Sequence, residues 1–247
     1  MTIGLEKLAE KEYPGRVIIL GKDPTGKKVV VVYAITGRSP SSQARKLVKE
    51  GEAIWAKPID ENILKTGQVE LLVYPAVYLS RGVVVSNGKH TSDIIEKMGE
   101  SPNPAAVLQS ALRTWDYEPD APIFTPRISG CVLSHEKAAL SVIRRGEDNS
   151  SMREIFEFSL VAGQGKMVTT YEGENRDPVK SFSGEPLSLE IREKTGQGMA
   201  KAVYDALGPA GEKPDFRVAV ACVCFSSLQK EDFEVSIINR CERKAHD

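Results

Sequence analysis

Short apolar runs separated by turn residues dominate the first part of the chain. Residues 16–20 and 28–36 are apolar runs on either side of Asp23-Pro24-Thr25-Gly26. Proline suits the second position of a β-turn and glycine tolerates positive φ, so this spacing predicts a β-hairpin. The run 28–36 is apolar on both faces, which is typical of a strand covered from both sides.

The same pattern predicts strands further along the chain. A second hairpin is expected from residues 127–133 and 138–144. A third is expected from residues 155–161 and 167–171, joined across Gly163-Gln164-Gly165. These glycines are not a dinucleotide-binding fingerprint, because no helix follows and the third glycine is missing. The other predicted strands are residues 69–73, 83–85, 216–225 and 233–239.

Helical spacing of apolar residues appears in five places. The clearest helix, residues 105–115, follows Asn103 as an N-cap and a proline at the first helical position. A short helix is expected at residues 42–49, and Ser39 or Ser41 could cap it. The remaining helices are predicted at residues 2–12, 93–98 and 190–207.

Element order and composition narrow the class of protein. Strands and helices in this order, without a repeat or linker, predict one α+β domain over residues 1–247, with helices covering antiparallel sheets. With 33 Lys and Arg against 34 Asp and Glu, the net charge is −1, so no general attraction to nucleic acid or to a membrane is expected. The four cysteines form no CxxC pair and the three histidines are scattered, which indicates neither a metal site nor a disulfide framework. The N-terminus lacks a signal-peptide apolar block and no run has transmembrane length, so we expect a cytoplasmic protein.

A proline-rich loop after the clearest helix carries the first group of candidate functional residues. Three prolines between positions 119 and 126 exclude a helix and stiffen the chain. Glu118 stands next to Tyr117 at the start of this loop, and Arg127 stands where the next strand begins. A carboxylate, a phenol and a guanidinium on a rigid loop suit a site for a polar ligand. An ordinary charged surface turn is the alternative interpretation.

A polar turn after the strand at 28–36 is a candidate anion site. Arg38 and Ser39 follow that buried run, and Arg45 lies a few residues later. Backbone N–H groups at the start of a helix, with arginine side chains nearby, suit a phosphate group. A structural helix cap with neighbouring arginines is the alternative.

The segment after residues 83–85 carries Asn87-Gly88 and His90. Both Asn and Gly tolerate positive φ, so this pair is typical of a tight turn. From the residues alone, Asn87 is interpreted as turn chemistry and His90 as an exposed loop residue.

Taken together, several short motifs resemble the archaeal-type IMP cyclohydrolase family. The resemblance covers roughly residues 13 to 185. The motifs are Tyr13-Pro14-Gly15-Arg16, Gly37-Arg38-Ser39, Tyr74-Pro75-Ala76, Val85-Ser86-Asn87-Gly88 with His90-Thr91, Asp116-Tyr117-Glu118-Pro119-Asp120 and Thr125-Pro126-Arg127-Ile128, with Tyr171-Glu172-Gly173 as a weaker match.

The resemblance implies an Ntn-hydrolase-like fold, a four-layer αββα sandwich of two antiparallel sheets between helices. It also implies a cyclohydrolase, a hydrolase acting on C–N bonds in cyclic amidines. The reaction would close the pyrimidine ring of 5-formamidoimidazole-4-carboxamide ribonucleotide to give IMP and water in purine biosynthesis. The implied partner is a small purine ribonucleotide, with no nucleic acid, membrane, metal or redox cofactor. Whether the chain forms a homo-oligomer is left open.

Site residues follow from the same resemblance. Tyr74 and Glu118 resemble the catalytic pair, because a carboxylate can take or orient the amide proton and a phenol can stabilise an oxyanion. Tyr78 is the alternative phenol, since Pro75 follows Tyr74 where the family has Asn. The positions that resemble substrate contacts are Arg38, Ser39, Asn87 and Arg127, and Arg16 and Arg45 are further candidates for the 5′-phosphate.

Two other functions are compatible with these features. An N-terminal-nucleophile amidohydrolase would need Thr2 exposed at the head of the first strand, but about a dozen helix-like residues separate Thr2 from Arg16. A repurposed or non-catalytic purine-nucleotide-binding protein on the same fold is the other alternative, because a shared fold does not guarantee a shared reaction.

Overall fold

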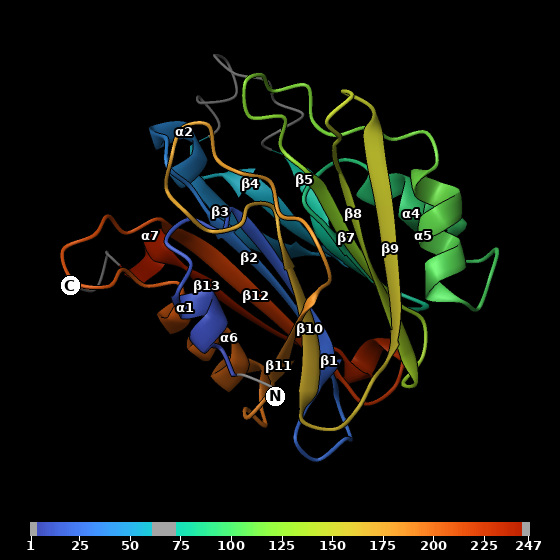
Figure 1. Ribbon diagram of the computed structural model, residues 1–247. Helices are drawn as coiled ribbons and strands as arrows, with labels where there is room; N and C mark the ends of the chain where they lie inside the picture. Colours follow the sequence, from blue (N-terminus) through green and yellow to red (C-terminus); the bar gives the residue numbers. More distant parts are fainter. Residues whose placement is uncertain (1–3, 61–72, 244–247) are drawn as a thin grey trace.

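The computed structural model describes residues 4–60 and 73–243. Two antiparallel β-sheets are stacked face to face between two layers of helices (Figure 1). This αββα arrangement confirms the expected α+β four-layer sandwich. Within the described residues, no helix has the length and apolar character needed to cross a bilayer.

One sheet has six strands in the order β11-β10-β1-β2-β12-β13. Its centre is the predicted hairpin of β1 and β2, in which Arg16 is opposite Ile35 and Lys22 is opposite Val29. The strand bounds are β1 Arg16–Lys22, β2 Val29–Thr36, β10 Gln164–Thr169, β11 Leu187–Glu190, β12 Arg217–Phe225 and β13 Glu234–Asn239.

The other sheet has seven strands in the order β3-β4-β5-β6-β7-β8-β9, so neighbours in the sheet are also neighbours along the chain. The predicted second hairpin is present as β7 and β8. The strand bounds are β3 Arg45–Glu50, β4 Ala53–Pro58, β5 Tyr74–Leu79, β6 Val83–Ser86, β7 Arg127–Val132, β8 Lys137–Arg145 and β9 Ser151–Ser159.

Helices cover the outer face of each sheet. Helices α1 (Glu6–Ala9) and α6 (Gly196–Ala206) pack on the six-stranded sheet, where Met199 and Val203 meet Ile19 and other strand residues. Helices α4 (Thr91–Lys97) and α5 (Pro104–Leu112) pack on the seven-stranded sheet. The short helices are α2 (Pro40–Gln43), η2 (Lys230–Asp232) and α7 (Arg240–Arg243).

The largest hydrophobic core lies between the two sheets. Gly130 of β7 allows the sheets to approach closely, because a Cβ atom there would lie 3.0 Å from Cδ1 of Leu20 in β1. The Asn103 cap was predicted correctly, since its Oδ1 accepts a hydrogen bond from the Ala106 N–H at 2.9 Å. Ser39 likewise caps α2, accepting a hydrogen bond from the Ser42 N–H at 3.1 Å.

The predicted helix at residues 42–49 is wrong beyond its first turn. Helix α2 ends at Gln43, and β3 begins at Arg45 and pairs with β4. Gly51, at φ 56°, forms the turn between these strands. Pairing with β4 therefore decides the conformation of a segment whose local sequence also suits a helix.

The predicted pairing of residues 155–161 with 167–171 is also wrong. Strand β9 pairs only with β8, at the edge of the seven-stranded sheet, whereas β10 pairs with β1 in the other sheet. The turn around Gly163 therefore carries the chain from one sheet to the other. Gly21 lies opposite Gly165 where β1 and β10 pair, and a Cβ atom on Gly21 would lie 2.4 Å from the carbonyl oxygen of Gln164.

Three helix predictions differ in extent from the structure. The helix expected at 190–207 starts only at Gly196, after the short strand β11. Helix α4 begins at Thr91 rather than at residue 93 and has no side-chain cap. In the described part of residues 2–12 the helix is Glu6–Ala9. Residues 69–72 of a predicted strand, and Thr2, lie outside the described residues.

Candidate active site

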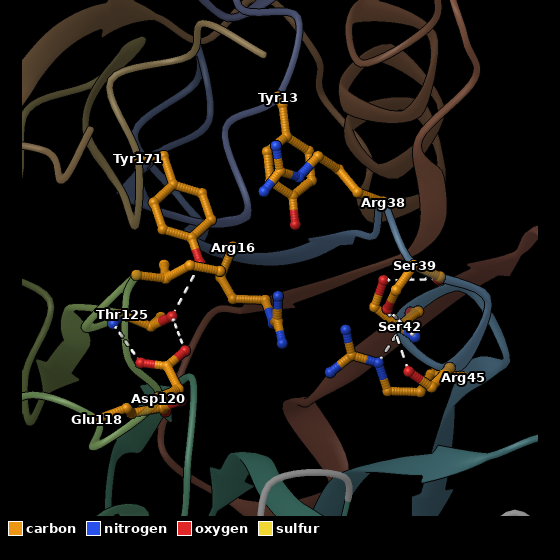
Figure 2. Close-up of a pocket in the computed structure, with 12 residues that line it drawn as sticks. Tyr13, Arg16, Arg38, Ser39, Ser42, Arg45, Glu118, Asp120, Thr125 and Tyr171 are labelled. Carbon is orange, nitrogen blue, oxygen red and sulfur yellow. Dashed lines mark hydrogen bonds between the residues drawn. The ribbon is translucent and has the colours of Figure 1, made fainter. Parts of the chain in front are cut away.

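A cavity of about 300 Å³ opens at one end of the paired sheets (Figure 2). It is lined by residues from both sheets and from the loops at that end. These are Tyr13, Arg16, Arg38, Ser39, Ser41, Ser42, Arg45, Glu118, Asp120, Ile123, Thr125 and Tyr171. The structure thus brings Arg38, Ser39 and Glu118 of the sequence-based candidates into one cavity.

Two arginines without a carboxylate partner dominate one side of the cavity. Arg16 is the first residue of β1 in one sheet, and Arg45 is the first residue of β3 in the other. Among the described residues, no ion pair is formed by either guanidinium, and Nε of Arg16 is buried without a hydrogen-bond partner. Arg45 is only 2% exposed, and its Nε donates to the carbonyl oxygen of Ser42 at 3.0 Å.

The electrostatics of this arginine pair favour an anion. Burial, together with the positive charge of Arg16, lowers the pKa of Arg45 to about 10, so both side chains stay charged at neutral pH. Two neighbouring cations that form no ion pair within the described residues, one of them the buried Arg45, cost free energy, because the nearby carboxylate of Glu118 offsets their desolvation only in part. An anionic ligand would offset that cost, and the planar guanidinium groups suit phosphate oxygens.

Arg38 and Ser39 line the same cavity but are partly engaged within the protein. Arg38 donates from Nη1 to the carbonyl oxygen of Arg176 at 2.9 Å, and its guanidinium lies 5.1 Å from the ring centroid of Tyr13. The hydroxyl of Ser39 caps α2. The structural-cap interpretation of this turn is confirmed, and the turn also faces the cavity, so its role as an anion site stays a prediction.

Glu118 is held by the proline-rich loop between α5 and β7. Its backbone N–H donates to the carbonyl oxygen of Thr125 at 2.9 Å, and the Thr125 N–H donates to Oδ1 of Asp120 at 2.7 Å. Glu118 is 8% exposed, and Oε1 lies 3.4 Å from Nη1 of Arg127. Burial raises the pKa of the Glu118 carboxyl, although the positive charges of Arg127 and Arg16 oppose that shift. A buried acid of this kind can exchange a proton closer to neutral pH than an exposed glutamate.

Arg127 lies behind Glu118 and does not line the cavity. Its Nε donates to the carbonyl oxygen of Asp116 at 2.8 Å, and its guanidinium lies 4.9 Å from the ring centroid of Trp115. In this structure Arg127 therefore contacts the carboxylate of Glu118 rather than the space that a ligand would occupy.

Asn87 is also outside the cavity lining. Its Oδ1 accepts a hydrogen bond from the Ile128 N–H at 2.8 Å, and its Nδ2 donates to the carbonyl oxygen of Pro126 at 2.9 Å. These two bonds engage both the oxygen and the nitrogen of the side-chain amide. Asn87 fixes the backbone just before and after Arg127.

Tyr74 and Tyr78 lie at opposite ends of β5. Tyr74 is 1% exposed, does not line the cavity, and has its hydroxyl 2.7 Å from that of Tyr33. The Tyr74 phenol nevertheless interacts electrostatically with Arg16 and Arg45, so it lies close behind the arginine pair. Tyr78 donates instead to Oε2 of Glu52 at 3.0 Å, which leaves it unsuited to be the site phenol.

His90 is buried, contrary to the expectation of an exposed loop residue. Its Nε2 is 3.0 Å from Oγ of Ser129, and its Nδ1 has no partner among the described residues. Burial, with a contribution from Arg127, lowers the pKa of His90 to about 3, so the ring is neutral. The turn brings this ring inward because α4 begins directly after it and packs on the sheet.

Sequence reasoning did not assign a site role to Tyr13, Tyr171 or Thr125. Tyr13 precedes β1 and Tyr171 follows β10, and their rings stack with centroids 5.4 Å apart. The Tyr171 hydroxyl lies 2.9 Å from Oγ1 of Thr125. The available signal was their presence in the short motifs before β1 and after β10. Among the described residues, no group of three or more His, Cys, Asp or Glu side chains gathers to hold a metal ion.

The fold and the cavity define an αββα sandwich protein with an arginine-lined cavity at one end of its sheets. Residues 13–228 match the family described as IMP cyclohydrolase-like protein. The chain therefore belongs to the family of IMP cyclohydrolase-like proteins, which confirms the resemblance found in the sequence motifs.

Individual relatives agree with this family. The chain is 31% identical over 196 residues to the IMP cyclohydrolase of Methanothrix thermoacetophila, covering 78% of this chain and 91% of the relative. It is 31% identical over 231 residues to the IMP cyclohydrolase of Methanocella arvoryzae, covering 92% of this chain and 98% of the relative. A match to the IMP cyclohydrolase of Methanocaldococcus jannaschii is 32% identical over 126 residues and covers 50% of this chain and 58% of the relative.

Proposed function

We propose that this protein is an IMP cyclohydrolase, which closes 5-formamidoimidazole-4-carboxamide ribonucleotide to IMP and water. One structural observation carries the proposal for this family member. A single cavity holds Arg16 and Arg45, which form no ion pair among the described residues, together with the buried carboxylate of Glu118. A phosphorylated substrate with a reacting amide needs both kinds of group.

The reaction joins two arms of one molecule, so the main task of the site is positioning. The carboxamide nitrogen attacks the formamide carbon, a C–N bond forms, and the former carbonyl oxygen leaves as water. Holding the arms in a near-attack geometry can contribute about 7 kcal/mol or more to the rate. Binding the phosphate at Arg16 and Arg45 would fix one end of the substrate and leave the imidazole arms towards Glu118.

Glu118 is the proposed proton acceptor for the attacking carboxamide. Its raised pKa suits this role, because general bases work best when their pKa lies near the working pH. The same carboxyl can return the proton to the departing oxygen. Arg127 would hold this carboxylate in place through the contact at 3.4 Å.

The other predicted site residues enter the proposal with different roles. Arg38 and Ser39 are proposed substrate contacts, since both face the cavity. Asn87 is a proposed positioning residue, because its amide is used up in fixing the backbone around Arg127. Tyr74, the phenol that resembles the family's catalytic tyrosine, is covered and bonded to Tyr33, so we propose that it supports the site without touching the substrate.

We further propose a cytoplasmic enzyme that acts on the free ribonucleotide, with residues 1–247 forming one domain. Neither the balanced charge nor the cavity suggests binding to nucleic acid or to a membrane.

A direct assay tests the proposal. Purified protein is incubated with the formamido ribonucleotide, and purine formation is followed by ultraviolet absorbance. We expect turnover in wild type and a loss of about 100-fold or more in kcat for Glu118→Gln, the size typical of losing a general base. Glu185→Gln, which changes an exposed carboxylate, is the matched control. Saturable binding of the nucleotide without turnover in wild type would instead favour the non-catalytic nucleotide-binding protein.

A further inference from the structure

The cavity contains a tyrosine, Tyr13, whose hydroxyl has no hydrogen-bond partner among the described residues. Tyr13 and Tyr171 both line the cavity. The Tyr171 hydroxyl is paired with Thr125 at 2.9 Å. In contrast, no hydrogen bond to the Tyr13 hydroxyl is found within residues 4–60 and 73–243. The two rings are stacked neighbours in the same part of the cavity. Nevertheless, within the described ranges only the Tyr171 hydroxyl has a hydrogen-bond partner.

The ring of Tyr13 is held in one place by its surroundings. It is 6% exposed, stacks on Tyr171 with an interplanar angle of 27°, and meets the edge of Phe216 at a centroid distance of 5.4 Å. The Arg38 guanidinium covers its face. The Tyr13 N–H donates to the carbonyl oxygen of Gly173 at 2.7 Å. A ring fixed on its faces and at its backbone presents its hydroxyl in one direction only.

That direction is towards the arginine pair. In Figure 2 the oxygen of Tyr13 points into the cavity, between Arg16 and Ser39. Both Arg16 and Arg45 lie near this phenol in the same cavity. Guanidinium groups donate hydrogen bonds and cannot accept them, so neither arginine can take the hydroxyl proton of Tyr13. An anionic oxygen placed between the arginines could accept it.

We propose that Tyr13 is a substrate-contacting residue, whose O–H donates to an oxygen of the phosphate monoester that Arg16 and Arg45 bind. This proposal rests on the proposed function in one respect only, namely which ribonucleotide carries the phosphate. The arginine pair in the cavity suits an anion such as a phosphate group whichever nucleotide carries it. Tyr13 is thus the phenol that meets the ligand, whereas Tyr74 is covered and bonded to Tyr33.

The test is equilibrium binding of two probes, inorganic phosphate and IMP, measured by titration calorimetry without any turnover. Tyr13→Phe keeps the ring stack and removes only the hydroxyl. We expect its dissociation constants for both probes to rise about tenfold or more, as for loss of a hydrogen bond to a charged group. Tyr78→Phe is the matched control. Its hydroxyl lies outside the cavity and is bonded to Glu52, so binding should change by no more than about twofold.

Binding of both probes to Tyr13→Phe with wild-type affinity would overturn the proposal, as would the absence of phosphate and IMP binding in wild type. If wild type binds both probes and Tyr13→Phe does not, but no purine forms from the formamido substrate, the proposal stands and the cyclohydrolase function fails. A second readout covers a variant that does not fold. Phosphate should perturb the tyrosine absorption band of wild type and of Tyr78→Phe, and an unperturbed band in both would contradict a contact to Tyr13.

Discussion

The Nη1 atom of Arg127 lies 3.4 Å from the Oε1 atom of Glu118, and both side chains are buried. Trp115 and the carbonyl oxygen of Asp116 hold the guanidinium from its other sides. The charge state of the one carboxylate proposed for catalysis therefore depends on a cation that does not itself face the cavity.

Removing this cation should change the pH dependence of the reaction. Burial raises the pKa of Glu118 and Arg127 opposes that shift, so Arg127→Gln should raise the pKa further. If the carboxylate is the base, kcat falls as the pH drops through this pKa. The acid limb of the kcat profile should then move to higher pH in the variant. Arg144→Gln, which breaks a partly exposed pair with Glu154, should leave the limb in place. If the acid limb of the kcat profile lies at the same pH in Arg127→Gln and in wild type, Arg127 does not control the pKa of the catalytic carboxylate.

His90 should make the folded protein sensitive to mild acid. Its pKa is lowered from 6.5 to about 3, so below pH 6.5 the unfolded chain binds a proton that the folded chain does not. Stability therefore decreases as the pH falls between these two values, by about 2 kcal/mol at pH 5 for this one group.

His90→Gln can keep the hydrogen bond to Ser129. It should remove the part of the acid-induced decrease in stability that comes from His90. Urea denaturation at neutral pH and near pH 5 measures the difference. The half-buried His135 also has a pKa lowered by burial, and His135→Gln should have the smaller effect. An acid-induced loss of equal size in wild type and His90→Gln would be inconsistent with this explanation.

Gly88 should not tolerate alanine. A Cβ atom there would lie 3.0 Å from Nη1 of Arg127, 3.2 Å from Nδ1 of His90 and 3.5 Å from Oε1 of Glu118. Gly88→Ala should shift the Arg127 and His90 side chains slightly, disturb the contact of Arg127 with Glu118, lower kcat, and destabilise the fold by about 1 kcal/mol. Thermal unfolding and steady-state kinetics measure both effects. Gly99→Ala is the control, because a Cβ atom at Gly99 meets nothing within 4 Å. Equal activity in both variants would show that the packing around Glu118 is not critical.

Inorganic phosphate should stabilise the protein through the arginine pair. Binding to the folded state alone raises stability, by about 2.7 kcal/mol when the ligand is at 100 times its dissociation constant. Arg45→Gln should lose most of this effect, whereas Arg81→Gln, at an exposed turn, should keep it. Melting temperatures with and without phosphate provide the measurement. Stabilisation of equal size in wild type and Arg45→Gln would place the anion elsewhere.

The sequence identified the elements that local chemistry determines. The β1–β2 hairpin follows from its turn residues, and α5 follows from Asn103 and the proline after it. Residues 45–50 were wrongly assigned to a helix, and the strand predicted at 167–171 was given the wrong partner, because their partners, β4 and β1, are set by tertiary pairing. No local pattern marks the point where the chain leaves one sheet for the other.

The candidate site likewise has parts that the local sequence reveals and parts that only the tertiary structure reveals. The proline-rich loop and the turn at Arg38 could be found locally, and the motifs pointed to the family. The importance of Arg16 and Arg45 could not be ranked, because each looks ordinary within its own strand. Only the stacked sheets bring these two guanidiniums into one cavity.

The two arginines begin strands of different sheets, β1 for Arg16 and β3 for Arg45. A bound anion that contacts both would join one half of the sandwich to the other. Its affinity would then depend on the spacing between the halves, so a change at Gly130, which does not line the cavity, would weaken binding without altering a cavity residue.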